Sequence, residues 1–547
     1  MEALRAHAIV WSVSSVMAGI YHSQTNVGKS GARNGRYGSF LPLISGASGR
    51  EQFKETGQAF SPDLRRLVRL AYHNLAEHIM TPKFHILTMT AALAISATAQ
   101  AEPRSYDAAK ADQFLNPLAE DIVPEDATSR LLHMRHTAYN AAMFGQVAVL
   151  TYNQIYAQAV DRNSARFVGF NRFAHDRDLA GPGYATFKTP NADTLYSNAY
   201  LDLSQGPVLL TVPPTKGRYY TVNLLDLYGN ATNISARTHG TSGGRYMVAT
   251  TEWGGDVPQG VTLFRVTQPY MWILMRIEAE NPAVVPIVRQ LQDAFTLAPM
   301  GRLPADRDFP EPGTIDNPAA FLKILDWVVE QAGVRNEELA HVHGFRDLGV
   351  GGPRTVDEAL ADDAVKQGVT AGFADARTVI ASSVAQNGVS TNGWREPLDI
   401  GRYGFNYNYR ASVNSLGTGA NVRLENFAFT TFEDADGEPL DGAKHDYVLR
   451  MASPPPANFF WSVTAYDRKT QELIPNAERK YLVSDNTEGL IRGEDGSITI
   501  IFSQQAGGPN AIPIPDGPFY LALRAQGPGR KMLDGTWRPT PVKKLQR

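Results

Sequence analysis

The chain has 547 residues, of which 52 are Lys or Arg and 55 are Asp or Glu, so its formal net charge is −3. A weakly acidic chain without a block of basic residues is not expected to bind nucleic acid. It contains no cysteine, which excludes disulfides, thiol nucleophiles and cysteine-ligated zinc.

Residues 80–101 predict a secretory signal peptide. Lys83 supplies a positive charge, residues 86–97 are apolar or small, and Ala99-Gln100-Ala101 matches the small-x-small pattern that signal peptidase cleaves. The apolar run of about 12 residues is shorter than the about 20 that a membrane-spanning helix needs, so we expect cleavage and not anchoring. A short buried helix is the alternative. The segment 1–79 is then interpreted as misassigned upstream translation or as a disordered stretch.

Cleavage after Ala101 would leave 446 residues with 42 basic and 50 acidic side chains, a net charge of −8. No later apolar run reaches the length of a membrane span. We therefore expect a periplasmic or secreted protein with no nucleic-acid partner. Seven of the twelve histidines would remain for any mechanism, namely His133, His136, His175, His239, His341, His343 and His445.

The first half of this mature chain predicts a helical segment followed by a β-domain. Apolar residues recur at spacings of three and four between 125 and about 160, which favours helix within 102–165. Gly145 leaves open whether this is one helix or two. Short β-rich runs separated by Gly, Pro and Asn then predict a first β-sandwich domain over 166–280. The runs lie at 208–212, 219–224, 245–248, 262–266 and 271–275.

The second half predicts a helical block over 281–400 and a second β-sandwich domain over 401–547. Helices are expected at 282–297, 318–332 and 356–384. Strands are expected at 427–432, 445–451, 459–466, 497–502 and 519–524, with Asp-Gly pairs as hairpin turns. The predicted fold class is mainly β with helical insertions (α+β): two β-sandwich or jelly-roll-like domains joined by a helical block.

The most unusual string is T-P-N-A-D-T-L-Y at 189–196, which brings an amide, a carboxylate, hydroxyls and a phenol together. It predicts a polar constellation of Asn191, Asp193 and Tyr196 at the mouth of a cleft. The alternative is structural, because Asn and Asp side chains often bond their own backbone in turns.

Asp226 is a carboxylate inside an otherwise apolar run, and a buried carboxylate needs a partner or a raised pKa. With Asp193 it would form the pair that a glycoside hydrolase needs, if the two lie roughly 5 to 10 Å apart. The alternative is a structural anchor that pairs with Arg276 or Arg218. Three further residues are candidates for substrate binding beside Asn191, namely Arg276, Tyr228 and His239.

A set of aromatic and basic residues in the last domain includes Trp461, Tyr466 and Arg524. Exposed aromatics are typical of sugar binding, whereas apolar residues at 461, 463 and 465 indicate that one face of this strand is core. No metal or cofactor is expected. The pairs His133/His136 and His341/His343 lack an evident third ligand, and the acidic run 433–437 lacks the downstream Glu of a calcium loop.

Residues from about 167 to 297 contain T-P-N-A-D-T-L-Y at 189–196 and Y-Y-T-V-N-L-L-D-L-Y-G-N at 219–230, and this part resembles the family catalogued as domain of unknown function 1254. Residues from about 409 to 545 contain D-G-E-P-L-D-G at 436–442 and F-F-W-S-V-T-A-Y-D at 459–467, and resemble its usual partner, domain of unknown function 1214. The resemblance implies a bacterial or viral protein of two β-sandwich or jelly-roll-like domains joined by helices, often exported. It leaves open a homo-oligomer and implies no particular chemistry.

Two functions remain as hypotheses. The first is an exported soluble enzyme, a hydrolase or lyase acting on a carbohydrate or other small polar molecule. Its site would lie in the first β-domain, with Asp193, Asp226 and Tyr196 as catalytic candidates. The second is a non-catalytic envelope protein that binds a ligand or assembles with itself. Convergence of the three candidates in an open pocket would favour the first.

Overall fold

The computed structural model describes residues 122–184, 186, 188–302 and 307–545. The predicted signal peptide at 80–101 and the segment 1–79 lie outside these residues. In the described part of the chain, no helix combines the length and the apolar composition that crossing a membrane requires.

The first element is one long helix, α5 (Ala127–Ile155), which ends in a single π-helical turn (Tyr156–Val160). Asp126 caps it by accepting a hydrogen bond from the backbone N–H of Ser129. The helix continues through Gly145. A Cβ there would lie 2.9 Å from Phe321 and 3.0 Å from Leu325, so the glycine lets another helix approach closely. The sequence leaves open whether this segment forms one helix or two, and the structure shows one.

The first β-sandwich consists of two sheets with the strand orders β1-β2-β8-β4-β5 and β7-β6-β3-β9. Apolar residues that alternate along the strands of both sheets, such as Leu195, Val208 and Ile273, form one buried core between them. The strands of the first sheet are β1 (Ala174–His175), β2 (Thr194–Asp202), β8 (Tyr270–Glu278), β4 (Tyr220–Leu225) and β5 (Ala231–Ser235). Those of the second are β7 (Thr262–Val266), β6 (Gly244–Thr250), β3 (Val208–Val212) and β9 (Thr296–Pro299). Two helices, α6 (Ala236–His239) and α7 (Val285–Ala294), accompany this sandwich.

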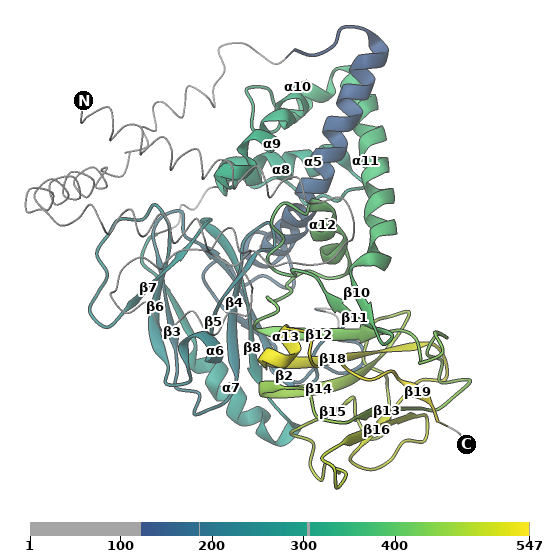
Figure 1. The fold of residues 1–547 in the computed structure, drawn as a ribbon. Coiled ribbons are helices and arrows are strands. Elements are labelled where there is room, and N and C mark those ends of the chain that lie inside the picture. The colour runs from purple at the N-terminus through teal and green to yellow at the C-terminus, as the bar shows by residue number, and fades with distance from the viewer. Residues whose placement is uncertain (1–121, 185, 187, 303–306, 546–547) are drawn as a thin grey trace, which may run out of the picture. The chain divides into compact units, whose positions relative to one another are not determined.

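Helices α8 to α12 pack with α5 into a helical block, which lies towards the top of Figure 1. Their bounds are α8 (Pro318–Gln331), α9 (Leu339–His343), α10 (Val356–Leu360), α11 (Asp363–Ser383) and α12 (Tyr407–Leu416). Gly368 and Gly372 bring α11 against the backbone of α5, where a Cβ would collide with Met134 and with the carbonyl oxygen of Arg135. Trp272 and Leu274, on the outer face of β8, are buried in the same core as these helices.

The second β-sandwich has the strand orders β10-β11-β12-β18-β14-β15 and β17-β16-β13-β19. Its core combines Phe427, Trp461 and Leu523 of one sheet with Leu449 and Ile500 of the other. The strands of the first sheet are β10 (Gly388–Thr391), β11 (Trp394–Pro397), β12 (Asn426–Thr431), β18 (Phe519–Pro528), β14 (Ala457–Asp467) and β15 (Leu482–Ser484). Those of the other are β17 (Ala511–Pro513), β16 (Ile498–Ser503), β13 (Tyr447–Met451) and β19 (Lys543–Lys544), with α13 (Arg530–Leu533) between β18 and β19.

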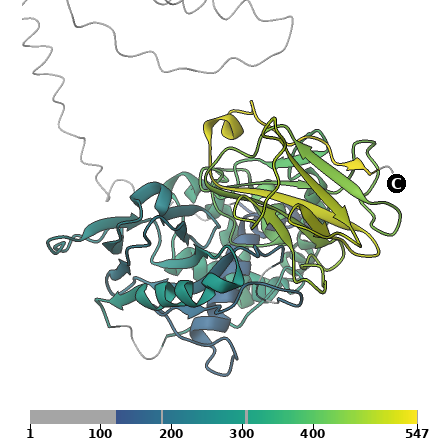
Figure 2. The ribbon, with the colours of Figure 1, turned by 90° about the horizontal axis from the view of Figure 1, so that it is seen from below.

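Figures 1 and 2 show the two sandwiches beside each other. They are in direct contact, since Phe460 of β14 is buried in the core of the first sandwich. The Tyr219 ring lies 5.0 Å from that of Phe459 and 5.8 Å from that of Phe460. The predicted fold class, mainly β with helical insertions, is confirmed.

Near both ends of the range 281–400, which the sequence predicts to be a helical block, the structure has strands that belong to the sandwiches. Strand β9 pairs with β3 in the first sandwich, and β11 pairs with β12 in the second. Conversely, α12 lies inside the range 401–547 that was interpreted as strands. Strands of four residues carry too little period to recognise. Helix α12 is marked only by the Asn406 side chain, which caps the N–H of Tyr409.

Candidate functional site

The outer face of the first sheet carries a polar pair. Residues 195, 199 and 201 of β2 point into the sandwich core, so Tyr196 points to the opposite face. Arg276 of β8 is its direct cross-strand partner. The guanidinium carbon of Arg276 lies 5.4 Å from the centroid of the Tyr196 ring. The sheet register therefore places a cation over a phenol ring.

The second sandwich also turns a polar face outward. In its larger sheet, Phe427, Trp461 and Leu523 point into the core, so the alternate positions point away. In register across β12, β18 and β14, Arg524 lies between Ala428 and Ser462. This face is thus polar where the opposite face is core.

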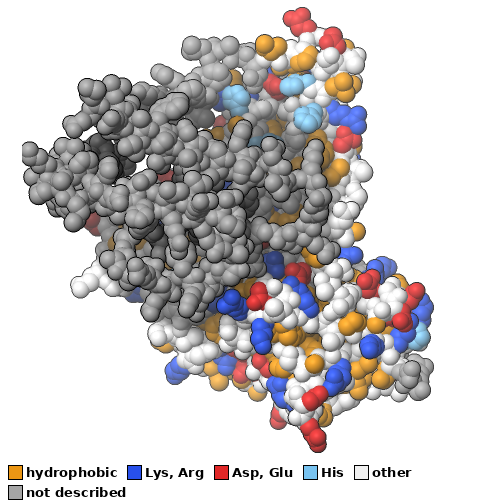
Figure 3. Space-filling model, in the orientation of Figure 1, with side chains coloured by type: hydrophobic (Ala, Val, Ile, Leu, Met, Phe, Trp, Pro, Cys, Tyr) orange, Lys and Arg blue, Asp and Glu red, His pale blue; other side chains and the backbone are white. Residues whose placement is uncertain are grey.

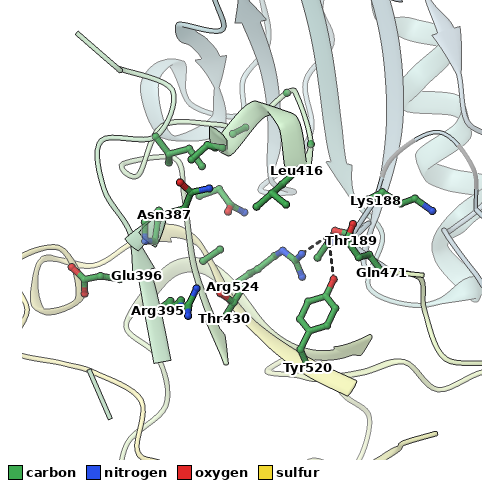
Figure 4. A pocket seen from close by; sticks show the side chains of 18 of the residues that line it. Lys188, Thr189, Asn387, Arg395, Glu396, Leu416, Thr430, Gln471, Tyr520 and Arg524 are labelled. Carbon is green, nitrogen blue, oxygen red and sulfur yellow. Dashed lines mark hydrogen bonds between the residues drawn. The ribbon is translucent and has the colours of Figure 1, made fainter. Parts of the chain in front are cut away.

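A cavity of about 770 Å³ lies between the two polar faces. Helix α12, the end of α11 and the loop 417–421 line its remaining walls. This volume is typical of sites for small molecules. Figure 4 places Lys188, Thr189 and Gln471 on one side, Asn387 and Glu396 on the other, and Arg524 between them.

On the first sandwich's side, the backbone N–H of Asn191 donates to the Tyr196 oxygen at 2.9 Å. Nη2 of Arg276 donates to the carbonyl of Gly419 at 3.2 Å. Nη1 of Arg276 is buried without a hydrogen-bond partner. Asn191, Tyr196 and Arg276 all line the cavity, so the structure brings together three of the residues that the sequence singled out.

On the other side, Arg524 is buried and held at both of its terminal nitrogens. Nη1 donates to the Tyr466 oxygen at 2.8 Å, and Nη2 donates to the carbonyl of Thr189 at 3.0 Å. The Thr189 hydroxyl is 2.7 Å from the Tyr520 oxygen (Figure 4). Thr189 has φ of 52°, a left-handed conformation that β-branched residues rarely adopt. Such strain is found where the surroundings fix a functional geometry.

Asp193 lies behind this wall and not on the cavity surface. Its side chain is 4% exposed, and neither carboxylate oxygen makes a hydrogen bond within normal distance. Burial raises the pKa of Asp193, and the Ser462 hydroxyl and the charge of Arg524 offset part of the rise. A buried carboxyl with a raised pKa next to a cavity is a common feature of functional sites.

Asp226 lies at the other end of the sheet. Thr194, which follows Asp193, pairs with Glu278, whereas Leu225, which precedes Asp226, pairs with Trp272. Six residues of β8 separate the two positions, about 20 Å along a strand. The structure therefore does not form the predicted pair of catalytic carboxylates 5 to 10 Å apart.

Asp226 instead closes a turn, where it accepts hydrogen bonds from the backbone and the side-chain amide of Asn230 at 2.8 and 2.9 Å. Burial raises its pKa, while the Asn230 bonds and the charge of Arg410 act against the rise. The ion pairs of the alternative interpretation, with Arg276 or Arg218, do not form, because Arg276 donates to Gly419 and Arg218 pairs with Glu280.

Tyr228 and His239 do not line the cavity. The Tyr228 hydroxyl donates to the carbonyl of Gly333 at 3.2 Å, which places it in the helical block. The His239 ring lies 5.0 Å from that of Tyr246, and its Nδ1 is 2.7 Å from the Thr238 hydroxyl. Their predicted contact with substrate thus has no support from this geometry.

The histidine pairs do not gather metal ligands. His133 Nε2 is 2.9 Å from a carboxylate oxygen of Asp347, and His341 is stacked on Tyr407. Among the described residues, no group of three or more histidine, aspartate or glutamate side chains is arranged to hold a metal ion.

Sequence reasoning assigned no role to several residues of the cavity wall, among them Tyr520, Gln526, Arg395 and Asn421. On the second sandwich's side of the cavity wall, only Arg524 could have been recognised from the sequence, because it is a single charge within the apolar run F-Y-L-A-L-R-A at 519–525. Of the aromatic and basic set, Trp461 is core, whereas Tyr466 supports Arg524 beside the cavity.

Residues 170–299 match the family model described as protein of unknown function DUF1254, and residues 425–530 match the one described as protein of unknown function DUF1214. The chain is similar in fold to the crystal structure of the VPA0106 protein from Vibrio parahaemolyticus. That similarity has a TM-score of 0.60 and 24% identity, over 76% of this chain and 100% of that one. An uncharacterized protein from Burkholderia cenocepacia matches with a TM-score of 0.37 and 12% identity, over 77% of this chain and 90% of that one. No curated protein matches the sequence.

Proposed function

The chain carries a DUF1254 domain followed by a DUF1214 domain, and we propose that a protein of this kind is an enzyme that cleaves a small polar molecule by hydrolysis or elimination. The site is the cavity between the two sandwiches. One observation carries the proposal: Asn191, Tyr196 and Arg276 converge on this cavity beside the buried carboxyl of Asp193.

The groups divide into an acid and a binding set. Asp193 serves as the proton donor, because burial raises its pKa above that of an ordinary carboxyl. Arg524 interacts electrostatically with both Asp193 and Tyr196. It therefore connects the carboxyl group of Asp193, behind the cavity wall, with the phenol of Tyr196 on the wall. Arg276, which lines the cavity and has one buried nitrogen without a hydrogen-bond partner, is assigned to hold the substrate. Asp226 has no part in this proposal, since it lies at the opposite end of β8.

A non-catalytic ligand-binding protein is the second candidate. It is favoured by the position of Asp193 behind the cavity wall, where a bound molecule would first meet Tyr196 and Arg276. In this second function the cavity is still the binding site, but Asp193 transfers no proton.

The decisive experiment begins with a broad substrate screen on protein produced from residue 102. The variants Asp193→Asn and Asp226→Asn are then assayed with the best substrate that the screen finds. Asp193→Asn should lower kcat by at least about 100-fold, the usual contribution of a general acid. Asp226→Asn is the matched control and should leave kcat within a few-fold. Equal kcat in wild type and Asp193→Asn would refute the proposed acid. Binding without turnover across the screen would favour the second candidate.

The proposal includes export, which rests on the signal-like sequence at 80–101. Protein purified from the periplasm or medium of a bacterial host should begin near Glu102 by N-terminal sequencing. Recovery of peptides from 1–79 in the mature protein, or retention in the cytosol, would contradict this part of the proposal.

A further inference from the structure

The cavity is positively charged in a chain that carries a net charge of −3. Five cationic and two acidic side chains line it. One of the acids, Glu396, is already neutralised from outside the cavity by Arg423 at 3.4 Å and Arg538 at 2.6 Å. On the surface of the second sandwich, by contrast, acidic and basic side chains are interspersed (Figure 3).

Three arginines of the lining have no carboxylate partner, and among carboxyl groups the fourth, Arg524, interacts only with that of Asp193 behind the cavity wall. Lys188 pairs with Glu472, but Arg276, Arg395, Arg468 and Arg524 form no ion pair with any described residue. The hydrogen bonds of Arg276 and Arg468 go to neutral oxygens, the carbonyls of Gly419 and Phe432. Several cations without an ion-pair partner around one cavity raise its potential and attract an anion.

The four guanidinium groups form two pairs. Arg276 lies over Tyr196, and Arg524 bonds Tyr466 beside it. The other two, Arg395 and Arg468, lie over the ring of Phe432 at 5.9 and 5.2 Å.

A row of stacked rings separates the two pairs. The ring of Phe432 lies 5.0 Å from that of Tyr520, and Tyr520 lies 5.2 Å from Tyr466. Two ring spacings, of 5.0 and 5.2 Å, therefore lie between the ring beneath Arg395 and Arg468 and the ring that Arg524 contacts. A ligand with charge at one end only would meet one pair and leave the other uncompensated.

We infer that the cavity binds an elongated ligand with an anionic group, a carboxylate or a phosphate, at each end. One end is held by Arg276 and Arg524, and the other by Arg395 and Arg468 near the mouth, where Arg468 is exposed. This inference rests on the same site as the proposed function and specifies its substrate class. Arginine suits the role because its planar fork binds carboxylate and phosphate in a bidentate manner.

The test compares probes of equal length by titration calorimetry on the full-length protein. Suberate and hexane-1,6-diyl bis(methyl phosphate), which each carry one negative charge at each end, should bind at least about tenfold more tightly than octanoate, and octane-1,8-diol should bind least. The two dianions distinguish carboxylate from phosphate recognition. Binding should weaken as salt rises, since the attraction is electrostatic. Equal affinity for suberate, octanoate and the diol, or no binding of either dianion, would overturn the inference.

Variants test each end separately. Arg395→Gln with Arg468→Gln should reduce the affinity for the better dianion to that for octanoate and leave octanoate binding unchanged. Arg276→Gln should weaken both. Arg177→Gln is the matched control, because Arg177 pairs with Asp293 on the exposed surface outside the cavity. An unchanged dianion affinity in the double variant would refute the second anionic end.

The same measurements separate this inference from the proposed enzyme. If the dianions bind as expected and no substrate turns over, the catalytic proposal fails and the ligand class stands. If a neutral substrate turns over and the Arg395/Arg468 double variant cleaves it unimpaired, the ligand class fails and the enzyme stands.

Discussion

The guanidinium of Arg276 and the ring of Tyr196 are directly opposite each other on β8 and β2, with 5.4 Å between the guanidinium carbon and the ring centroid. The backbone N–H of Asn191 holds the Tyr196 oxygen at 2.9 Å. The Arg276 side chain is held in turn by its hydrogen bond to the carbonyl of Gly419 at 3.2 Å. This part of the cavity is therefore preorganised before a ligand arrives, which lowers the entropic cost of binding.

Replacing Tyr196 by Phe should destabilise the protein by about 1–3 kcal/mol, because the buried N–H of Asn191 would lose its acceptor. Turnover of the substrate from the screen should fall as well, since the phenol faces the cavity. Urea unfolding and kcat measure the two effects. The control is Tyr156→Phe, where the lost bond is to the exposed Glu311. Equal stability losses in both variants would show that water replaces the acceptor at Asn191.

Replacing Asp193 by Asn should change how stability depends on pH. Burial raises the pKa of Asp193 above its ordinary 3.8. The folded state then retains a proton that the unfolded state releases, so the group's contribution to stability is full at low pH. It is lost as the pH rises from 3.8 through the folded-state pKa. The free energy of unfolding of Asp193→Asn, relative to wild type, should therefore increase over this range.

Asp495→Asn provides a control of opposite sign. Hydrogen bonds from Ser497 lower the pKa of Asp495, so its contribution to stability is present above the ordinary pKa and is lost as the pH falls. Urea titrations at several pH values measure both differences. A pH-independent difference for Asp193→Asn would mean that its pKa is not raised.

Replacing Glu425 by Ala should destabilise the protein by about 3 kcal/mol. This buried carboxylate accepts from the Tyr219 hydroxyl at 3.0 Å, the Ser235 hydroxyl at 3.0 Å and Nε of Arg237 at 2.7 Å. Its removal leaves a partly buried guanidinium without its counter-charge. Glu472→Ala, which breaks the exposed pair with Lys188, should cost less than about 1 kcal/mol. Similar midpoints for both variants in urea would contradict the role of Glu425.

Replacing Gly372 by Ala should destabilise the helical block by about 1–3 kcal/mol, despite the better helix propensity of alanine. The added methyl would collide with the carbonyl oxygen of Arg135 on α5. Thr370→Ala, on the exposed side of the same helix, should be neutral or slightly stabilising. Thermal unfolding followed by circular dichroism compares the two. A stabilised Gly372→Ala would show that α5 and α11 are less closely packed.

Much of the fold could be predicted from local pattern. The strongest periodic segment, expected at 318–332, is α8 (Pro318–Gln331), and the run expected at 219–224 is β4 (Tyr220–Leu225). Sheet partners could not be predicted. The strands β9 and β11 are short, and their assignment to one sandwich or the other depends on contacts with distant strands, which leave no trace in local sequence.

The site was predictable in part. The polar string around Asn191 and Tyr196 pointed to the cavity because so many hydrogen-bonding groups in a β-rich segment are unusual. Asp226 has the same signature, a charge in an apolar run, but it closes a turn with Asn230. Only the register of β8 distinguishes the two aspartates. The contributions of Tyr520 and Arg395 could not be predicted, since they follow from the meeting of two domains.

The bond between Arg524 and Thr189 joins residues 335 positions apart. Contacts of such separation form late in folding, after the units that carry them have folded. The cavity therefore exists only once the second sandwich has docked on the first. During synthesis, Thr189 of the T-P-N-A-D segment cannot bond to Arg524 until residue 524 has been made and β18 has paired within its sheet. Ligand binding should accordingly appear in a refolding experiment only after the signals of either sandwich alone.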